Sequence, residues 1–359
     1  MNIFSARTKG SAHRHLFNDL MPYILIFSTL LILLISMGRF YLNFTRPNVE
    51  LKGKTFVFFY IPSNSSYPEV KRELLRKGYI RNIKTFNWSA QRMNYMNRVK
   101  AGKYKILEGM SNRALLQMLR AGHQEAVKVT INGARTPGEL AGKIGHLLEA
   151  DSSSFMKLFT NSSFLARYHV TPQTSLSLFI PDTYHLYWNT SADQFFQRMY
   201  KEYLKFWMGP RNKRCDSLGL SIPEVVTLAS VIEKETAKND EKKIIAGVYM
   251  NRLRKHIPLQ ADPTVIFSLN DYTIKRVLNE HLKIDSPYNT YKFAGLPPGP
   301  ICLPSVSSID AVLNYQPHQY LYFCAKDDLS GYHNFAISLA EHNRNAKKYQ
   351  EAMNKLNIK

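Results

Sequence analysis

The sequence predicts an α+β protein that carries one transmembrane helix near its N-terminus. Three observations support this class. The run 21–38 contains no charged residue and is long enough to span a bilayer. Short apolar runs rich in β-favouring residues lie at 55–61 and 127–131. Helical patterns with capping residues separate and follow these runs. We expect four segments: a cytoplasmic tail (1–20), a transmembrane helix (21–41), a small α/β subdomain (47–125) and a mixed α+β domain (126–359).

The apolar run near the N-terminus predicts a membrane anchor. The first charged residue after it is Arg39, which the aromatic residues Phe40 and Tyr41 follow. A cleaved signal peptide would need a shorter apolar run and a small-x-small cleavage site, which residues 37–41 do not offer. A buried core helix is the other alternative, and the uncharged length beside a short basic N-terminus argues against it. Basic residues nearly balance on the two sides, so we take the simpler orientation, with the large C-terminal part outside the cytoplasm.

The charge balance indicates a polyanionic partner. The chain has 48 basic and 27 acidic residues, a net charge of +21. Nucleic acid is one candidate, but the anchor favours an anionic membrane surface or cell-wall polymer, so we expect no nucleic-acid partner. The three cysteines, Cys215, Cys302 and Cys324, are widely spaced and include no CxxC pair. This spacing supports neither a zinc site nor a disulfide framework, and we expect no metal and no cofactor.

The predicted subdomain alternates strands and helices. Pro68 and Ser111 stand where helices would begin, and Gly78 and Gly122 stand where they would end. The order of strand, turn and helix over residues 102–122 resembles half of a LysM module, a small wall-polysaccharide binder. From these signals we expect strands at 55–61 and 102–109, and helices at 68–78, 89–97 and 111–122.

The predicted α+β domain opens with similar signals. Thr136 and Asp151 are helix N-caps, and Pro137 takes the first helical position. An aromatic-rich turn lies at 179–184, after a strand at 127–131 and before a helix at 192–207.

The next helix carries two carboxylates beside its apolar face. Ser221 and Glu224 form a capping box that opens it. At 100° per residue, Glu233 and Glu235 lie on opposite flanks of the buried face, and periodicity does not choose between them. A carboxyl group beside apolar surface has a raised pKa and can donate a proton near neutral pH. The alternative is that both are solvated edge residues. Asn239 is the expected cap of the following helix, which runs to about residue 253.

Proline-stiffened polar loops follow this helix pair. They carry Gln, Asp, Thr, Asn and Tyr side chains, which suit sugar recognition because amides and carboxylates bond to hydroxyls and aromatic rings cover apolar sugar faces. Ordinary turn formation is the alternative explanation for Asp262 and Asn289. We expect six substrate-binding residues: Gln260, Asp262, Thr264, Tyr288, Asn289 and Tyr291.

Five stretches form a series of motifs: Ala229–Thr236, Val248–Leu253, Leu259–Val265, Tyr288–Tyr291 and Gly295–Ile301. Together they resemble the motif series of the endolytic murein transglycosylases of the MltG, or YceG-like, family. A closing motif at 331–335 and 341–343 is also similar. Two places depart from the family pattern: Leu176-Ser177 stands where Glu-Gly is usual, and Leu303-Pro304-Ser305 where Asn-Pro-Gly is usual.

The resemblance implies an activity and a location. Family members are single-pass proteins of the inner membrane with a LysM-like subdomain and a catalytic domain outside the cytoplasm, here the periplasm. They cut peptidoglycan glycan strands between N-acetylmuramic acid and N-acetylglucosamine, leave a 1,6-anhydro end and are thought to terminate strands. Wall synthases are possible partners on this basis. The family's catalytic glutamate is assigned to Glu233.

One carboxyl group suffices for this chemistry. The acid protonates the bridging oxygen, and the same group then takes the proton of the sugar's own C6 hydroxyl, so no water is needed. We expect Glu233 to have a raised pKa for this role, with Glu235 as its competitor. A water-using muramidase would need a second carboxylate, for which Asp262 is the candidate. A membrane-anchored wall-binding protein without activity is the rival from another class.

Overall fold

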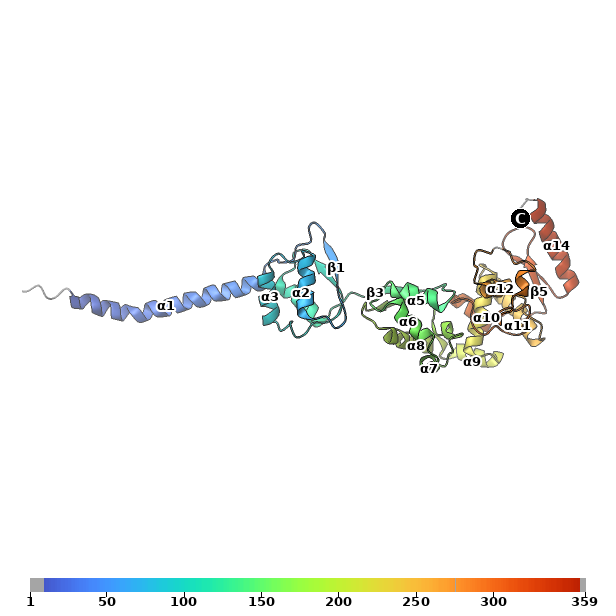
Figure 1. The fold of residues 1–359 in the computed structure, drawn as a ribbon, viewed down its shortest axis with the longest axis horizontal. Helices are drawn as coiled ribbons and strands as arrows, with labels where there is room; N and C mark the ends of the chain where they lie inside the picture. Colours follow the sequence, from blue (N-terminus) through green and yellow to red (C-terminus); the bar gives the residue numbers. More distant parts are fainter. Residues whose placement is uncertain (1–9, 275, 356–359) are drawn as a thin grey trace, which may run out of the picture. The chain divides into compact units, whose positions relative to one another are not determined.

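The computed structural model describes residues 10–274 and 276–355 and divides into two compact units, residues 1–125 and 126–359 (Figure 1). Helices dominate both units, and the strands of the described residues form three separate antiparallel pairs. The predicted α+β class is therefore confirmed.

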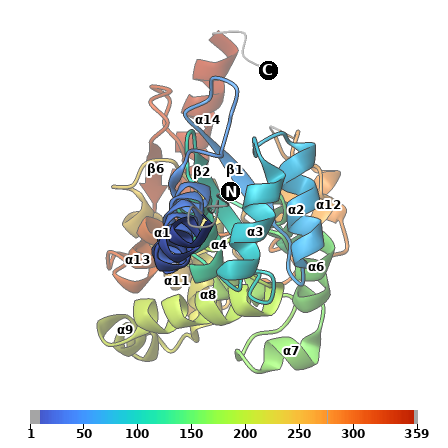
Figure 2. The ribbon, with the colours of Figure 1, turned by 90° about the vertical axis from the view of Figure 1, so that its left-hand side faces the viewer.

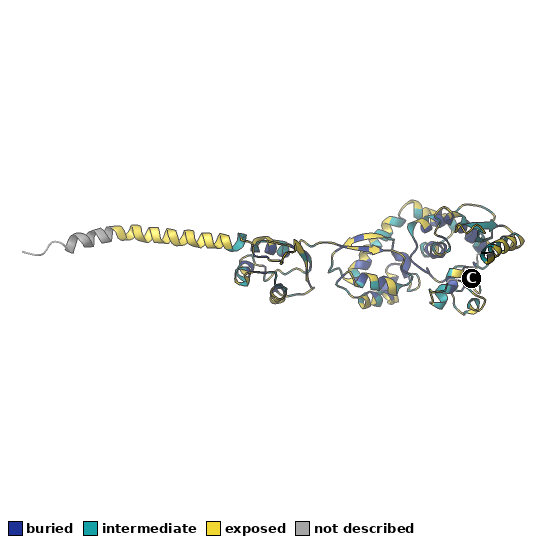
Figure 3. Ribbon diagram, turned by 90° about the horizontal axis from the view of Figure 1, so that it is seen from above, coloured by how far each residue is buried: buried dark blue, intermediate teal, exposed yellow. Residues whose placement is uncertain are grey.

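The first unit begins with a long apolar helix, α1 (Gly10–Thr45). Within its stretch Leu20–Thr45, the most apolar 18-residue window has a mean hydropathy of 2.3 and no buried side chain, and the ribbon of Figure 3 carries the colour of exposed residues there. This helix is long and apolar enough to cross a membrane, but it extends beyond the predicted span 21–41 at both ends. Part of the predicted tail is therefore helical, and residues 1–9 lie outside the described residues.

The rest of the first unit has the order strand, helix, helix, strand, helix (Figure 2). Strand β1 pairs antiparallel with β2, from Phe56 opposite Leu107 to Ile61 opposite Gly102. The end of α1 packs on this unit, where Phe44 lies 5.3 Å from the ring of Trp88. The elements are β1 (Phe56–Ile61), α2 (Tyr67–Arg76), α3 (Ile83–Arg92), β2 (Gly102–Leu107) and α4 (Asn112–Ala121).

One predicted helix of this unit is misplaced. The stretch 89–97 was expected to be helical, but α3 occupies Ile83–Arg92. The cause is Asn82, whose side-chain oxygen accepts hydrogen bonds from the backbone N–H groups of Lys84 and Thr85 and starts the helix earlier. The caps at Ser111 and Gly122 are confirmed.

The second unit begins with an antiparallel strand pair and a cluster of helices around an aromatic core. Strand β3 pairs antiparallel with β4, which begins at Asp182 inside the segment expected to be a turn. Phe155, Phe159, Phe179, Phe195 and Phe196 form the buried centre. The elements are β3 (Val127–Ile131), α5 (Pro137–Gly145), α6 (Ser152–Phe159), α7 (Ser162–Ala166), η1 (Ser175–Leu178), β4 (Asp182–Leu186) and α8 (Ala192–Trp207).

The remaining elements pack around helix α10 (Ile222–Glu235), which contacts α9, α11, α12 and α13. Two expectations are corrected here. Helix α11 starts after Glu241, not after Asn239, and Asp262 opens a helix where a loop was expected, because Pro263 fits the first turn. The other elements are α9 (Pro210–Leu218), α11 (Lys242–Arg254), α12 (Asp262–Leu269), η2 (His281–Lys283), α13 (Val306–Leu313), β5 (Tyr322–Ala325), β6 (His333–Ala336) and α14 (Leu339–Lys355).

Candidate active site

Helix α10 brings both candidate glutamates to the same place in the fold. The predicted capping box is confirmed: Ser221 accepts from the N–H of Glu224, and the Glu224 carboxylate accepts from the N–H of Ser221. Residues 225–232 are all buried, so the helix is fixed along most of its length. Its last turn carries Glu233 and Glu235, which face different neighbours.

Glu233 is held by hydrogen bonds as an ionised carboxylate. Its Oε2 atom accepts from the hydroxyls of Ser305 (2.6 Å) and Ser308 (2.5 Å) and from the ammonium group of Lys242 (3.0 Å). Burial alone would raise the pKa of Glu233, but these bonds outweigh it and the pKa is lowered. The expectation of a raised pKa at Glu233 is therefore wrong. A group held in this way is a poor proton donor near neutral pH.

Glu235 has the opposite environment. Burial raises its pKa to about 7, and the nearby charge of Asp262 adds to the effect. The Tyr249 hydroxyl donates a hydrogen bond of 2.6 Å to its Oε1 atom, which limits the rise. Glu235 is also the last residue of α10, where the helix dipole disfavours negative charge. A carboxyl group with a pKa of about 7 is protonated in a large share of molecules near neutral pH, as a general acid must be.

A pocket of about 360 Å³ surrounds Glu235, and we call it the Glu235 pocket. Three of the predicted binding residues, Gln260, Asp262 and Tyr291, line it. The Tyr291 hydroxyl donates a 2.5 Å hydrogen bond to Asp262 Oδ1, which orients both side chains. The remaining lining residues are Tyr249, Arg252, Leu259, Leu321, Tyr322, Phe323, Leu339 and His342.

The other three predicted binding residues do not line this pocket. Thr264 is buried, and its hydroxyl bonds to the carbonyl of Ala261 and to Thr290. Asn289 is also buried, and its amide donates to the carbonyls of Leu282 (2.9 Å) and Ile284 (2.8 Å). Tyr288 packs on Phe267 in the core. These side chains shape the loop rather than the pocket, so the turn explanation holds for Asn289.

We expect Asn289→Ala to lower stability without altering the pocket. It removes the two hydrogen bonds that the buried Asn289 amide donates to the carbonyls of Leu282 and Ile284, which should cost roughly 2–3 kcal/mol. Gln260→Ala is the matched change on the pocket wall and should cost less than about 1 kcal/mol, since Gln260 is exposed. Urea unfolding of the two variants measures this difference. Equal stability losses would contradict the assignment of Asn289 to the turn.

Several residues of the site could not be assigned from the sequence. Tyr249 and Arg252 lie three residues apart on α11 and so share a helix face, a spacing that could have indicated them. Arg252 is buried and bonds to the carbonyl of Leu321 (2.7 Å) and to Gln260 Oε1 (3.2 Å). Lys242 and Ser308 carried no sequence signal, because their contact with Glu233 exists only once α11 and α13 pack on α10. In the described residues, no group of His, Cys, Asp or Glu side chains could hold a metal ion.

Known proteins match this chain over most of its length. The sequence model of the YceG-like family matches residues 59–348. The chain belongs to the YceG-like family. The endolytic murein transglycosylase of Bacillus subtilis is 30% identical over 85% of this chain and 88% of its own length. The enzyme of the same name from Streptococcus pneumoniae strain D39 is 28% identical over 91% of this chain. This chain spans only 65% of that pneumococcal protein.

A solved structure confirms the family at the level of the fold. A YceG-like protein from Listeria monocytogenes has 29% sequence identity and a TM-score of 0.55. The likeness covers 81% of this chain and 99% of the Listeria chain. Ser305, which stands where the sequence resemblance leads us to expect glycine, lies in the site, and its hydroxyl donates a hydrogen bond of 2.6 Å to Glu233 Oε2.

Proposed function

We propose that this chain is an endolytic lytic transglycosylase that cuts peptidoglycan glycan strands, with Glu235 as the acid. The observation that carries the proposal is the Glu235 carboxyl group, whose pKa burial raises to about 7, in a pocket lined by aromatic and polar side chains. Aromatic rings of Tyr291 and Tyr322 can cover apolar sugar faces, and Gln260 and Asp262 can bond to hydroxyls. Two relatives named endolytic murein transglycosylase support the substrate class.

The reaction needs one proton donor that becomes a proton acceptor. Neutral Glu235 protonates the oxygen that joins N-acetylmuramic acid to N-acetylglucosamine, and the bond breaks with oxocarbenium character at the muramyl carbon. The Glu235 carboxylate then accepts the proton of the muramyl C6 hydroxyl, whose oxygen closes the 1,6-anhydro ring. The proton count is restored, and no water is consumed. Tyr249, whose own pKa burial raises well above its usual range, stabilises the carboxylate between the two steps.

Glu233 then has a positioning role. Its carboxylate ties the last turn of α10 to α11 through Lys242 and to α13 through Ser308. This connection fixes the direction in which Glu235 leaves the helix. The assignment differs from the one the family resemblance implied, and it rests on the opposite pKa shifts of the two glutamates.

We expect Tyr249→Phe to move the alkaline limit of activity upward. The hydrogen bond from Tyr249 favours the ionised form of Glu235, so its loss raises the pKa of Glu235 further. Activity, which requires the protonated acid, should persist to a pH roughly one unit higher, while the rate in the second step falls. A pH profile of strand cleavage tests this, with the exposed Tyr187→Phe as control. A limit that stays in place would exclude Glu235 as the titrating acid.

Two rival functions are separated by the products. A wall-binding protein without activity would release no fragments from isolated glycan strands. An exolytic enzyme would release only terminal units, whereas endolytic cleavage gives fragments of intermediate length from the start. We expect fragments of intermediate length from the start when the full chain in detergent is incubated with long strands. Sizing the fragments over time measures this.

We further propose that α1 anchors the protein in the inner membrane, with the part of the chain that follows α1 in the periplasm. The supporting observation is the exposed apolar stretch Leu20–Thr45. Protease added outside spheroplasts should degrade the large C-terminal part, and full protection of that part would contradict the orientation. Synthases that make the strands are the proposed protein partners, because they supply the substrate at the same membrane face.

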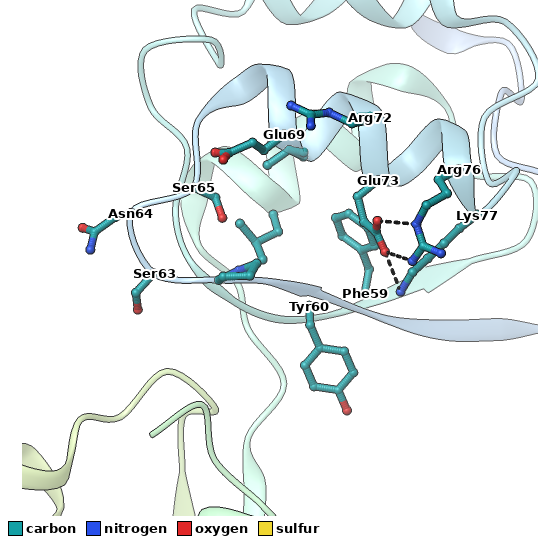
Figure 4. A pocket seen from close by; sticks show the side chains of 13 residues that line it. Phe59, Tyr60, Ser63, Asn64, Ser65, Glu69, Arg72, Glu73, Arg76 and Lys77 are labelled. Carbon is teal, nitrogen blue, oxygen red and sulfur yellow. Dashed lines mark hydrogen bonds and ion pairs between the residues drawn. The ribbon is translucent and has the colours of Figure 1, made fainter. Parts of the chain in front are cut away.

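The first unit is proposed to bind the cell wall as a LysM-like subdomain. Its supporting feature is a pocket of about 490 Å³ between β1 and α2, lined by Tyr60, Ser63, Glu69 and Arg72 among others (Figure 4). Glu73, which also lines this pocket, forms ion pairs with Arg76 and Lys77, as the dashed lines show. If this pocket binds strands, adding Arg72→Glu to the inactive Glu235→Gln protein should reduce the amount of protein that co-sediments with wall sacculi. Lys84→Glu, on the exposed side of α3, is the control and should have no effect.

A further inference from the structure

Glu235 lines a second pocket in addition to the Glu235 pocket. This second pocket has a volume of about 560 Å³, and we call it the serine pocket. Both pockets are lined by Glu235 and share no other lining residue. Both volumes lie in the range of about 300–1,000 Å³ that is usual for sites of small ligands. The residues that characterise the serine pocket are Lys234, Asn239, Lys242, Ser305 and Ser307.

The floor of the serine pocket is rigid and polar. The side chain of Lys242 is only 5% exposed, and its ammonium group donates to Ser307 (3.1 Å) and Ser305 (3.3 Å) as well as to Glu233. The Ser307 hydroxyl in turn bonds to the side-chain oxygen of Asn239 at 3.1 Å. Because these groups hold one another in place, they are preorganised for a polar ligand.

The two pockets offer different chemistry. The Glu235 pocket contains the rings of Tyr291, Tyr322 and Phe323, which suit a sugar face, whereas the serine pocket is lined by no aromatic residue. Its lining carries two lysines against one ionised carboxylate, that of Glu233, and the Lys234 side chain is exposed. Hydroxyl, amide and ammonium donors with a small excess of positive charge suit amide and carboxylate groups.

We propose that the serine pocket binds the glycan unit on the side of the scissile bond opposite to the unit in the Glu235 pocket. It holds this unit through the amide and carboxylate groups of its substituents. The inference rests on the proposed function, because an enzyme that cuts within a strand must bind sugar units on both sides of its acid. The acetamido group of the ring and the peptide arm of the muramyl unit share this chemistry, and strands with and without arms distinguish them.

Blocking the serine pocket should reduce cleavage without unfolding the protein. Ser307 is exposed at the second position of α13, and Ser307→Phe places a large ring in the pocket. Ser153→Phe is the matched control, because Ser153 is an exposed serine at the second position of α6, another eight-residue helix. We expect Ser307→Phe to lower kcat/KM for long strands at least tenfold, mainly through KM, and Ser153→Phe to leave it unchanged. Wild-type cleavage by Ser307→Phe would overturn the proposal.

A binding measurement covers the case in which Ser307→Phe fails to fold. In the inactive Glu235→Gln, Cys324→Ser protein, the remaining native cysteines, Cys215 and Cys302, are buried, so a maleimide would report on an introduced thiol. Saturating strands should slow modification of Ser307→Cys at least fivefold and leave Ser153→Cys unaffected. If only the strands that carry peptide arms protect Ser307→Cys, the pocket binds the arm. If strands with and without arms both protect it, the pocket binds the substituents of the sugar ring. Equal rates with and without bound strands would overturn the proposal.

The same experiments separate this inference from the proposed function. If Glu235→Gln still cleaves strands, or if strands do not bind the protein, the proposed function fails and this inference with it. If Glu235→Gln is inactive and binds strands while the Ser307 variants behave like their Ser153 controls, only the serine pocket proposal fails.

Discussion

Glu235→Gln should abolish strand cleavage while the protein keeps its fold. Glutamine has nearly the same shape and can still accept the hydrogen bond of Tyr249, but it cannot donate and recover a proton. Loss of a general acid typically lowers the rate by about 10²–10⁴-fold. The measurement is the cleavage rate of purified full-length protein in detergent, normalised to the folded fraction.

Glu233→Gln is the internal control for this prediction, because Glu233 lies only two residues away on the same helix. Its folded molecules should retain cleavage within about tenfold of the wild type, since Glu233 acts only by orienting the last turn of α10. The reverse pattern, with Glu233→Gln inactive and Glu235→Gln active, would return the catalytic role to Glu233 and contradict the assignment made from the two environments.

The second large effect concerns stability. Glu233→Gln leaves the buried ammonium group of Lys242 without its anionic partner. Breaking a fully buried ion pair costs about 3–5 kcal/mol, and we expect roughly 2–3 kcal/mol here because the Glu233 side chain is 27% exposed. Adding Lys242→Met to Glu233→Gln should recover most of the lost stability, because an apolar residue of similar length needs no charged partner. Urea unfolding of the two single variants and the double variant measures the coupling.

The stability lost in Glu233→Gln should depend on pH. The pKa of Glu233 is lowered in the folded protein, so its ionised form stabilises the fold at pH values above its ordinary pKa of 4.5. That contribution is lost as the pH falls below this value. The difference in stability between the wild type and Glu233→Gln should therefore shrink in acid. A difference that is independent of pH, or a double variant as unstable as Glu233→Gln, would show that the ion pair does not carry the effect.

Local signals predicted most of the fold. The caps at Ser111, Thr136 and Asp151 each accept the backbone hydrogen bond expected of them. Helix 192–207 has the predicted bounds. The errors arose where a competing cap was overlooked, as at Asn82, or where a polar stretch that looked like a loop contained a helix start, as at Asp262. These signals describe single segments, so they did not give the packing of α11 and α13 on α10.

The candidate site shows the same limit more clearly. Helical periodicity placed Glu233 and Glu235 on opposite flanks, but it could not tell which flank meets Lys242 and Ser308 and which meets Tyr249. Their pKa values depend on those partners, which come from parts of the chain up to 75 residues away. Gln260, Asp262 and Tyr291 were found because binding groups cluster after the helix pair, whereas the burial of Asn289 was visible only in the folded loop.

The chemical form of the new strand ends tests the central claim most directly. The fragments are released by the full-length protein in water enriched in a heavy oxygen isotope and are analysed by mass spectrometry. This measurement distinguishes a lytic transglycosylase from a water-using muramidase. We predict that every new muramyl end is a 1,6-anhydro end, lighter by one water than a reducing end and free of the heavy oxygen isotope. Reducing ends that carry the heavy oxygen would contradict the account, because they would show that water, and not the C6 hydroxyl, attacks the muramyl carbon.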